Sequence, residues 1–254
     1  MLVRGALGVD RRALDVGDEA VAHPRAGAPH ERGPIGHALT LSQRRGYQAG
    51  MDASDFVPES SSLRTLRAAA ADCRGCHLYA PATQTVFGEG PRSALLMMVG
   101  EMPGDREDRE GHVFVGPAGR ELDAGLERVG ISRSDAYLTN VVKHFKFEER
   151  GKRRIHDTPK KSEVDACLPW LRAELRAVEP RVLLFLGATA AKALLGSSFR
   201  LTRSRGQPVE SDLAPVVMAT IHPAAILRAR DSAARDAERE AFTRDLEAVA
   251  AVLG

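Results

Sequence analysis

Four short apolar runs alternate along the chain with amphipathic stretches whose apolar residues recur at helical spacing. Each run is short enough for a buried strand, and each stretch is long enough for a helix. The runs cover residues 95–100, 136–139, 181–187 and 215–221. The helical stretches cover residues 63–72, 117–129, 163–178, 188–195 and 235–253. This alternation predicts the α/β class, with a four-stranded parallel sheet covered on both faces as a three-layer α/β/α sandwich.

Residues 1–50 lack this regularity. They hold 8 of the 23 glycines, no cysteine and no sustained helical or strand period. Segments with so little apolar pattern rarely repay the conformational entropy that ordering removes. We therefore expect a disordered extension at 1–50, followed by one folded domain at 51–254. Met51 is a second candidate for the start of translation, which would make 1–50 a misread upstream stretch; a genuine flexible tail is the alternative.

Composition excludes several classes of protein. The chain has 254 residues, a net charge of +2 and 43% apolar residues, which suits a globular protein but not a globally basic nucleic-acid coat. No apolar run approaches the ~20 residues of a membrane span, and no secretory signal opens the chain. Three cysteines without such a signal argue against a secreted disulfide framework. We expect a monomeric cytoplasmic protein with no membrane contact.

Known nucleotide and esterase signatures are missing from the sequence. There is no phosphate-binding P-loop, no Gly-x-Gly-x-x-Gly after a strand and no Gly-x-Ser-x-Gly elbow. In open parallel sheets, ligands bind beyond the carboxyl ends of the strands. The segments expected there are 100–104, 140–144, 187–190 and 222–225, three of which carry polar or titratable side chains.

The cysteines suggest a metal centre. Cys73 and Cys76 form a Cys-x2-Cys pair, and Cys167 is the third cysteine of the chain. A centre with four ligands needs one more donor, and spacing alone does not choose among the histidines. Zinc and an iron–sulfur cluster both accept three cysteines and one histidine. Two unligated thiols at a helix end are the alternative.

A basic segment occupies residues 143–161. It carries eight basic and three acidic residues, a local net charge of +5, with Phe145 and Phe147 interleaved. This combination is typical of a loop that contacts a nucleic-acid backbone. A solvated charged loop is the alternative.

Seven short motifs occur in an order that resembles the uracil-DNA glycosylase superfamily, nearest its iron–sulfur family 4. They are CRGC at 73–76, VFGEG at 86–90, GEMPG at 100–104, FVGPAG at 114–119, TNVVK at 139–143, LGATA at 186–190 and IHP at 221–223. The run KRRIH at 152–156 is similar to the loop that marks the UdgX-type branch. The resemblance covers residues 54–254 and implies the uracil-DNA glycosylase fold.

The resemblance also implies a cofactor and a base pocket. A [4Fe–4S] cluster would be held by Cys73, Cys76, His144 and Cys167, with histidine where family 4 usually has cysteine; zinc is the less expected alternative. In the pocket, Phe114 would stack on a flipped uracil and Asn140 would read its Watson–Crick edge. Met102 would lie beside the base, and His222 would stabilise negative charge on it as it leaves.

For the UdgX-type branch, the resemblance implies covalent capture of DNA. His156 would attack C1′ of the sugar after uracil has left, with Glu101 as its carboxylate partner and Asp105 in the same loop. Lys152, Arg153 and Arg154 would contact DNA. The expected partner is uracil-containing DNA, preferably single-stranded, with the protein at the nucleoid when it acts. The alternatives are a hydrolytic glycosylase with turnover and a non-catalytic iron–sulfur DNA-binding protein.

Two positions depart from the family pattern. Met102 stands where the pattern commonly has glutamine, and Ala224 stands where it commonly has serine. If the glutamine side chain places the base or Glu101, that contribution is lost here; if only the backbone N–H of this position matters, nothing changes. A missing serine hydroxyl predicts weaker DNA binding and unchanged chemistry.

Overall fold

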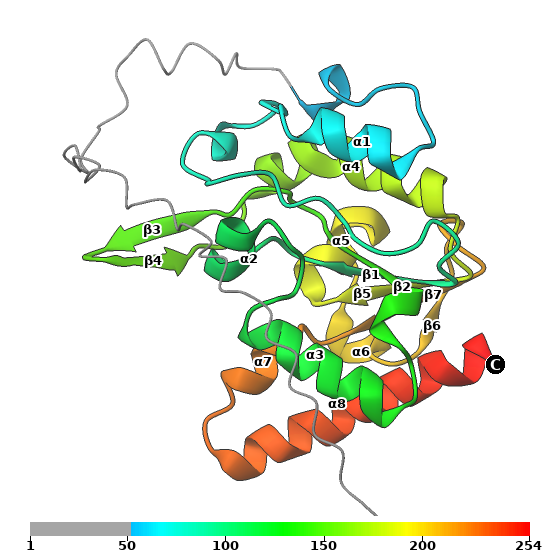
Figure 1. Cartoon of the computed structure of the whole chain (residues 1–254). Helices are drawn as coiled ribbons and strands as arrows, with labels where there is room; N and C mark the ends of the chain where they lie inside the picture. The colour runs from blue at the N-terminus through cyan, green and yellow to red at the C-terminus, as the bar shows by residue number, and fades with distance from the viewer. Residues whose placement is uncertain (1–51) are drawn as a thin grey trace, which may run out of the picture. The chain divides into compact units, whose positions relative to one another are not determined.

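The computed structural model describes residues 52–254, and a five-stranded sheet runs through their centre (Figure 1). The strand order is β2-β1-β5-β7-β6. Four of these strands are parallel, which confirms the predicted core: β1 (Leu96–Gly100), β2 (Ala136–Asn140), β5 (Val182–Leu186) and β7 (Val216–Thr220). The extension predicted at 1–50 lies outside the described residues.

The fifth strand is a correction to the four-stranded prediction. β6 (Pro208–Val209) pairs antiparallel with β7 at the edge of the sheet. Two residues carry no detectable period, so the hydrophobic pattern could not reveal this strand. Its proline also fits an edge position, because proline has no N–H to donate to a strand on both sides.

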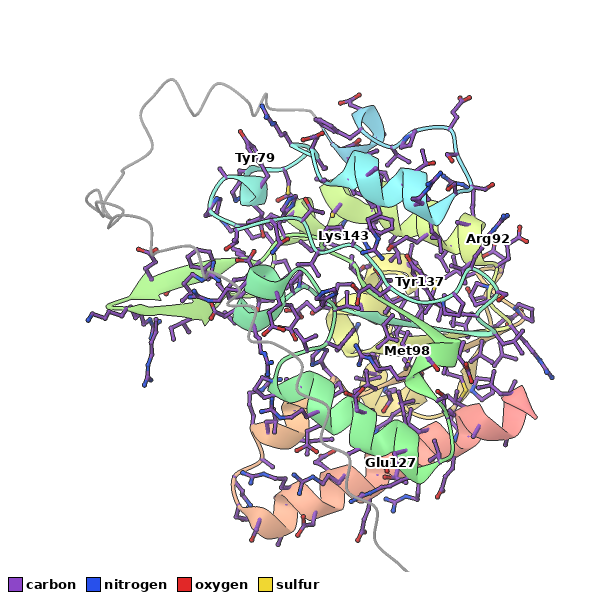
Figure 2. All side chains as sticks on the ribbon, in the orientation of Figure 1. Tyr79, Arg92, Met98, Glu127, Tyr137 and Lys143 are labelled. Atoms are coloured by element: carbon purple, nitrogen blue, oxygen red, sulfur yellow. The ribbon has the colours of Figure 1, made fainter. Side chains whose placement is uncertain are left out.

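Alternate side chains of the parallel strands enter two separate apolar cores. Met97 and Tyr137 belong to the core under α1 (Leu63–Ala70), α4 (Lys161–Val178) and α5 (Ala188–Leu195). Met98 belongs to the core under α3 (Pro117–Arg128), α7 (Pro223–Leu227) and α8 (Ser232–Leu253). Figure 1 shows α1 and α4 on one side of the sheet and α3 and α8 on the other, and Figure 2 labels Met98 and Tyr137. The predicted three-layer α/β/α arrangement is confirmed.

Shorter elements fill the connections. They are α2 (Asp105–Glu110), α6 (Leu201–Ser204) and three 3-10 turns at Ala53–Asp55, His77–Tyr79 and Arg133–Asp135. No helix among residues 52–254 is long and apolar enough to cross a membrane.

The basic segment, which we expected as a loop, contains an antiparallel hairpin. β3 (Phe147–Arg150) pairs with β4 (Arg153–His156), with Phe147 opposite His156. Gly151 makes the turn at φ +62°, a conformation that glycine adopts without steric cost. The hairpin projects from the body of the molecule beside α2 (Figure 1). Its strands are mostly exposed, so no hydrophobic period marked them in the sequence.

The packing of α3 against α8 generates the first prediction. A Cβ at Gly125 would lie 2.8 Å from Phe242 Cε1 and 2.9 Å from Leu246 Cδ1. Gly125→Val should therefore lower the free energy of unfolding by about 1–3 kcal/mol through overpacking, measured by urea denaturation. Ala124→Val, on the exposed face of the same helix, is the matched control. It should cost less than about 1 kcal/mol, and equal losses in the two variants would contradict this packing.

Candidate active site

A cavity of about 510 Å³ opens at the carboxyl end of the parallel strands. Its walls bring together all seven residues that the sequence assigned to catalysis and base binding: Glu101, Met102, Asp105, Phe114, Asn140, His156 and His222. Glu101 and Met102 follow β1, Asn140 is the last residue of β2, and His222 follows β7. The cavity therefore occupies the edge at which parallel sheets bind their ligands.

Asn140 ends β2 with its amide oxygen unpaired. The residue is 2% exposed, and its Oδ1 has no hydrogen-bond partner among residues 52–254. A Cβ at Gly100 would collide with Asn140 Oδ1 and Phe114 Cζ, so the missing side chain there leaves room for both groups. A buried acceptor without a donor is costly. Its position in the cavity wall suits a ligand that supplies an N–H group.

Phe114 is held in a strained backbone conformation. Its φ of +52° lies in the left-handed region, which costs a residue other than glycine roughly 1–3 kcal/mol. The next loop residues are fixed by Glu107, whose Oε1 accepts a hydrogen bond from the Gly116 N–H at 2.8 Å. Gly119 allows close approach to the Phe114 carbonyl, with which a Cβ would collide. The Phe114 ring stacks near His222, with centroids 6.1 Å apart and planes at 28°.

His222 lines the same cavity as a neutral hydrogen-bond donor. Burial, helped by the nearby Arg228 and His156, lowers its pKa to about 4. Its Nδ1 accepts a hydrogen bond from the backbone N–H of Ala224 at 3.2 Å and so caps α7. Because Nδ1 is an acceptor, the proton of the neutral ring lies on Nε2.

His156 lies at the mouth of the cavity, at the end of β4. Its Nε2 is 3.5 Å from Glu101 Oε1, at the end of β1. The His156 side chain is 48% exposed and the Glu101 side chain 21%. The imidazole can therefore be reached by a large substrate while its second nitrogen faces a carboxylate.

Arg154, which the sequence assigned to DNA, pairs with two carboxylates of the protein itself. Its guanidinium donates to Asp108 Oδ2 at 2.7 Å and also to Asp105 Oδ1, and it lies 4.9 Å from the centroid of the Phe147 ring. The side chain is 13% exposed. Charge alone could not tell that its partners are carboxylates of α2 rather than phosphates. Arg154 joins the hairpin to the body of the protein.

Asp105 is occupied by the same contact. Burial opposes its ionised form, but hydrogen bonds from Arg109 and Arg154 outweigh that effect and hold its pKa below the usual range. Glu101, rather than Asp105, is the carboxylate that pairs with His156.

Lys152 and Arg153 remain exposed at the tip of the hairpin, as a phosphate-contacting role requires. The structure adds residues that sequence reasoning missed. Arg228 and the 37%-exposed Leu227 line the cavity at the end of α7, and the buried Glu107 lines it from α2. Little in the sequence pointed to these three residues. Leu227 and Arg228 lie a short distance after the His222-Pro223 pair, and Glu107 lies in a helix whose residues are all charged.

The four proposed cluster ligands are all buried: Cys73, Cys76, His144 and Cys167. Two sulfurs accept hydrogen bonds, from Trp170 Nε1 to Cys73 at 3.2 Å and from the Lys143 backbone N–H to Cys167 at 3.3 Å. His144 Nδ1 has no partner among residues 52–254, while its Nε2 is 2.9 Å from Thr85 Oγ1. The imidazole nitrogen is buried without a partner, and His144 lines the same small cavity as Cys73, which fits a metal-bound group.

Burial disfavours the charged forms of Cys76, Cys167 and His144, so the two thiols would lose their protons only on binding a metal. Burial, with a smaller contribution from Cys73, raises the pKa of Cys76 to about 11. Burial also raises the pKa of Cys167 and lowers that of His144 to about 4, so the imidazole is neutral and can act as a ligand. Within 52–254, no three His, Cys, Asp or Glu side chains converge on one metal ion. A [4Fe–4S] cluster binds its ligands through four different irons and does not require such convergence.

The family is decided by comparison with known sequences. The sequence profile of the Uracil DNA glycosylase superfamily matches residues 87–247. The chain belongs to this superfamily. The match includes every cavity residue named above, together with His144 and Cys167, and begins after Cys73 and Cys76.

Three relatives within the superfamily carry the name Type-4 uracil-DNA glycosylase. The protein of Pyrobaculum aerophilum is 36% identical over 191 residues, which cover 72% of this chain and 91% of the relative. The protein of Thermotoga maritima is 37% identical over 164 residues, 64% of this chain and 82% of the relative. The protein of Sulfurisphaera tokodaii is 33% identical over 176 residues, 65% of this chain and 76% of the relative.

The pKa of His222 in this glycosylase-superfamily chain predicts how its stability depends on pH. The folded value of about 4 lies below the ordinary value of 6.5, so the unfolded chain binds the proton more readily. Stability should then fall as the pH drops through that window. His222→Asn keeps an N-cap acceptor and removes the titration. Its loss of unfolding free energy between pH 7 and 4.5, measured in urea, should be about 2 kcal/mol smaller than that of the wild type. Parallel curves would contradict the buried neutral imidazole.

Proposed function

We propose that the protein is a uracil-DNA glycosylase whose His156 captures the sugar from which uracil has left. Membership of the superfamily and the names of its relatives support uracil excision. The observation that carries covalent capture is the 3.5 Å approach of His156 Nε2 to Glu101 Oε1 in the wall of the cavity that also contains Asn140 and Phe114.

Recognition of uracil follows from the donors and acceptors of the cavity. The base must leave the stack, because its glycosidic bond cannot be reached inside one. Phe114 then stacks on the flipped base. The unpaired Oδ1 of Asn140 accepts the N3–H of uracil, and its NH2 group donates to O4. Cytosine presents an acceptor at N3 and donors at its exocyclic amine, so it fails both contacts. Single-stranded DNA is the preferred substrate, since no base pair has to be broken.

Departure of the base requires stabilisation of negative charge. The bond from C1′ to N1 breaks, and its electron pair leaves with uracil. His222 Nε2–H donates a hydrogen bond toward O2, where part of that charge collects. A partly buried donor that is already oriented by its bond to Ala224 stabilises this charge without reorganisation.

Capture uses the electron-poor sugar that remains. A lone pair on one ring nitrogen of His156 forms a bond to C1′, while the proton on the other nitrogen passes toward Glu101. The carboxylate thereby neutralises the imidazolium that alkylation would otherwise create. No group in this scheme hydrolyses the new bond, so each protein molecule acts once.

The cluster has a structural role in this proposal. Cys73, Cys76, His144 and Cys167 would hold a [4Fe–4S] cluster, which supplies a crosslink between the segment after α1, the start of the basic segment, and α4. These residues thus hold in place the chain from which the hairpin extends.

Denaturing gel electrophoresis with a uracil-containing single-stranded oligonucleotide tests capture. The wild type should form a shifted band that resists heat and SDS. His156→Ser should form no such band yet release uracil repeatedly, because water can reach C1′. Glu101→Gln should slow band formation by about 100-fold, the usual scale for loss of a general base. Uracil release by the wild type with no shifted band would identify a hydrolytic enzyme, and no release at all would contradict the glycosylase itself.

Metal analysis tests the ligand set separately. Purified protein should be brown and contain iron and sulfide, and Cys167→Ser should lose both. His144→Cys should keep the cluster, since thiolate is a common ligand at such centres. One zinc ion per chain, without iron, would contradict the cluster and leave the role of His156 untouched.

A further inference from the structure

A fully buried ion pair lies between the sheet and α4, outside the cavity. Lys143 Nζ and Glu174 Oε2 form it, and the two side chains are 1% and 0% exposed. Figure 2 labels Lys143 on the α4 side of the sheet. Buried ion pairs are weak contributors to stability, because desolvation offsets their attraction, and apolar residues often serve as well. This pair therefore calls for an explanation beyond folding.

Glu174 is saturated with donors from three segments. Its Oε1 accepts from the Gly88 N–H at 3.1 Å, the Tyr137 hydroxyl at 3.0 Å and the Thr139 hydroxyl at 2.9 Å, while its other oxygen binds Lys143. An acceptor with this many partners is rigid. Glu174 therefore holds the ammonium group of Lys143 at a fixed position beside α4.

Lys143 in turn holds the backbone of Asn140, the residue proposed to recognise the base. Its Nζ donates to the backbone carbonyl of Asn140 at 2.7 Å and to Thr139 Oγ1 at 2.7 Å. With Glu174 as the third acceptor, all three ammonium protons are used. The peptide group of Asn140 is thus fixed from the interior, on the side away from the ligand.

The same residue also reaches the proposed cluster ligands. The backbone N–H of Lys143 donates to Cys167 Sγ at 3.3 Å, and His144 is the next residue along the chain. The backbone carbonyl of Lys143 accepts a hydrogen bond from the Val86 N–H at 2.8 Å. Lys143 is therefore bonded at once to the Asn140 backbone and to a cluster ligand.

We infer that Lys143, anchored by Glu174, is a positioning residue for base recognition. It links the backbone carbonyl of Asn140 to the proposed cluster ligand Cys167. This inference rests on the proposed function and adds a specificity-determining element to it. Lys143 touches neither substrate nor cavity. Its effect on the reaction passes through the orientation of the Asn140 side chain.

Single-turnover kinetics with protein in excess over a uracil-containing oligonucleotide test the inference. The variants are Lys143→Met and the double variant Lys143→Met/Glu174→Gln, in which no unpaired charge is left buried. Misplacement of Asn140 should lower the maximal rate of uracil release by about tenfold or more. The protein concentration that gives half the maximal rate should change by less than about twofold, because backbone contacts set it. Arg239→Met, which breaks the Arg239–Glu121 ion pair between α8 and α3, is the matched control and should leave the maximal rate unchanged.

A purely structural role predicts the opposite pattern. Loss of folded protein would raise the half-saturating concentration and leave the maximal rate of the folded fraction intact. A double variant that folds and reacts at the wild-type maximal rate would therefore overturn the inference.

Hydrogen–deuterium exchange of the iron-loaded protein gives a readout independent of activity. Exchange in residues 139–145 should accelerate in the double variant, while exchange in α3 and α8 stays as in the wild type. Unchanged exchange at 139–145 would also overturn the inference. If the wild type releases no uracil, the proposed function fails, and the exchange result still decides whether Lys143 fixes this segment.

Discussion

The position of His156 depends on one guanidinium. An isolated two-stranded hairpin is marginally stable at best, so β3 and β4 cannot by themselves hold a side chain at a defined point. Arg154 supplies what the hairpin lacks. It binds Asp105 and Asp108 on α2 and lies against Phe147. The loop that begins with Glu101 connects β1 to α2. The contact of Arg154 with α2 therefore holds the hairpin beside the end of β1, where Glu101, the partner of His156, lies. The basic segment, which has the composition of a DNA contact, thus contains the residue, Arg154, that fixes its hairpin to the rest of the protein.

The rest of the cavity is arranged before any ligand arrives. Asn140 keeps an acceptor buried and unpaired, Phe114 keeps a left-handed backbone, and burial keeps His222 neutral. Each feature costs stability in the free protein. Two apolar cores, one on each face of the sheet, offset that cost and hold the strand ends from which these residues extend. Groups that are oriented in advance need little reorganisation when a ligand binds, which is how electrostatic stabilisation becomes effective in catalysis.

Much of this arrangement could be read from the sequence, and the failures have physical causes. The parallel strands are buried on both faces, so they stand out as continuous apolar runs such as 182–186. β3, β4 and α2 carry mostly charged, exposed residues, and no period marks them. The cysteines indicated a metal centre, but spacing alone could not select His144, which came from resemblance. The carboxylate partners of Arg154 could not be foreseen, because a positive charge does not reveal whether it pairs with a carboxylate or a phosphate. Lys143 was hidden for a related reason, since a lysine inside a basic run is normally expected at the surface.

Peptide mass mapping of DNA-treated protein tests the central claim most directly. After reaction with a uracil-containing oligonucleotide, nuclease digestion and trypsin cleavage, the account predicts that the remaining sugar phosphate is attached to the tryptic peptide 155–160, at its histidine. Fragmentation that assigns the added mass to His156 would establish which residue of the protein captures C1′. An adduct on any other peptide, or uracil release with peptide 155–160 recovered wholly unmodified, would contradict it.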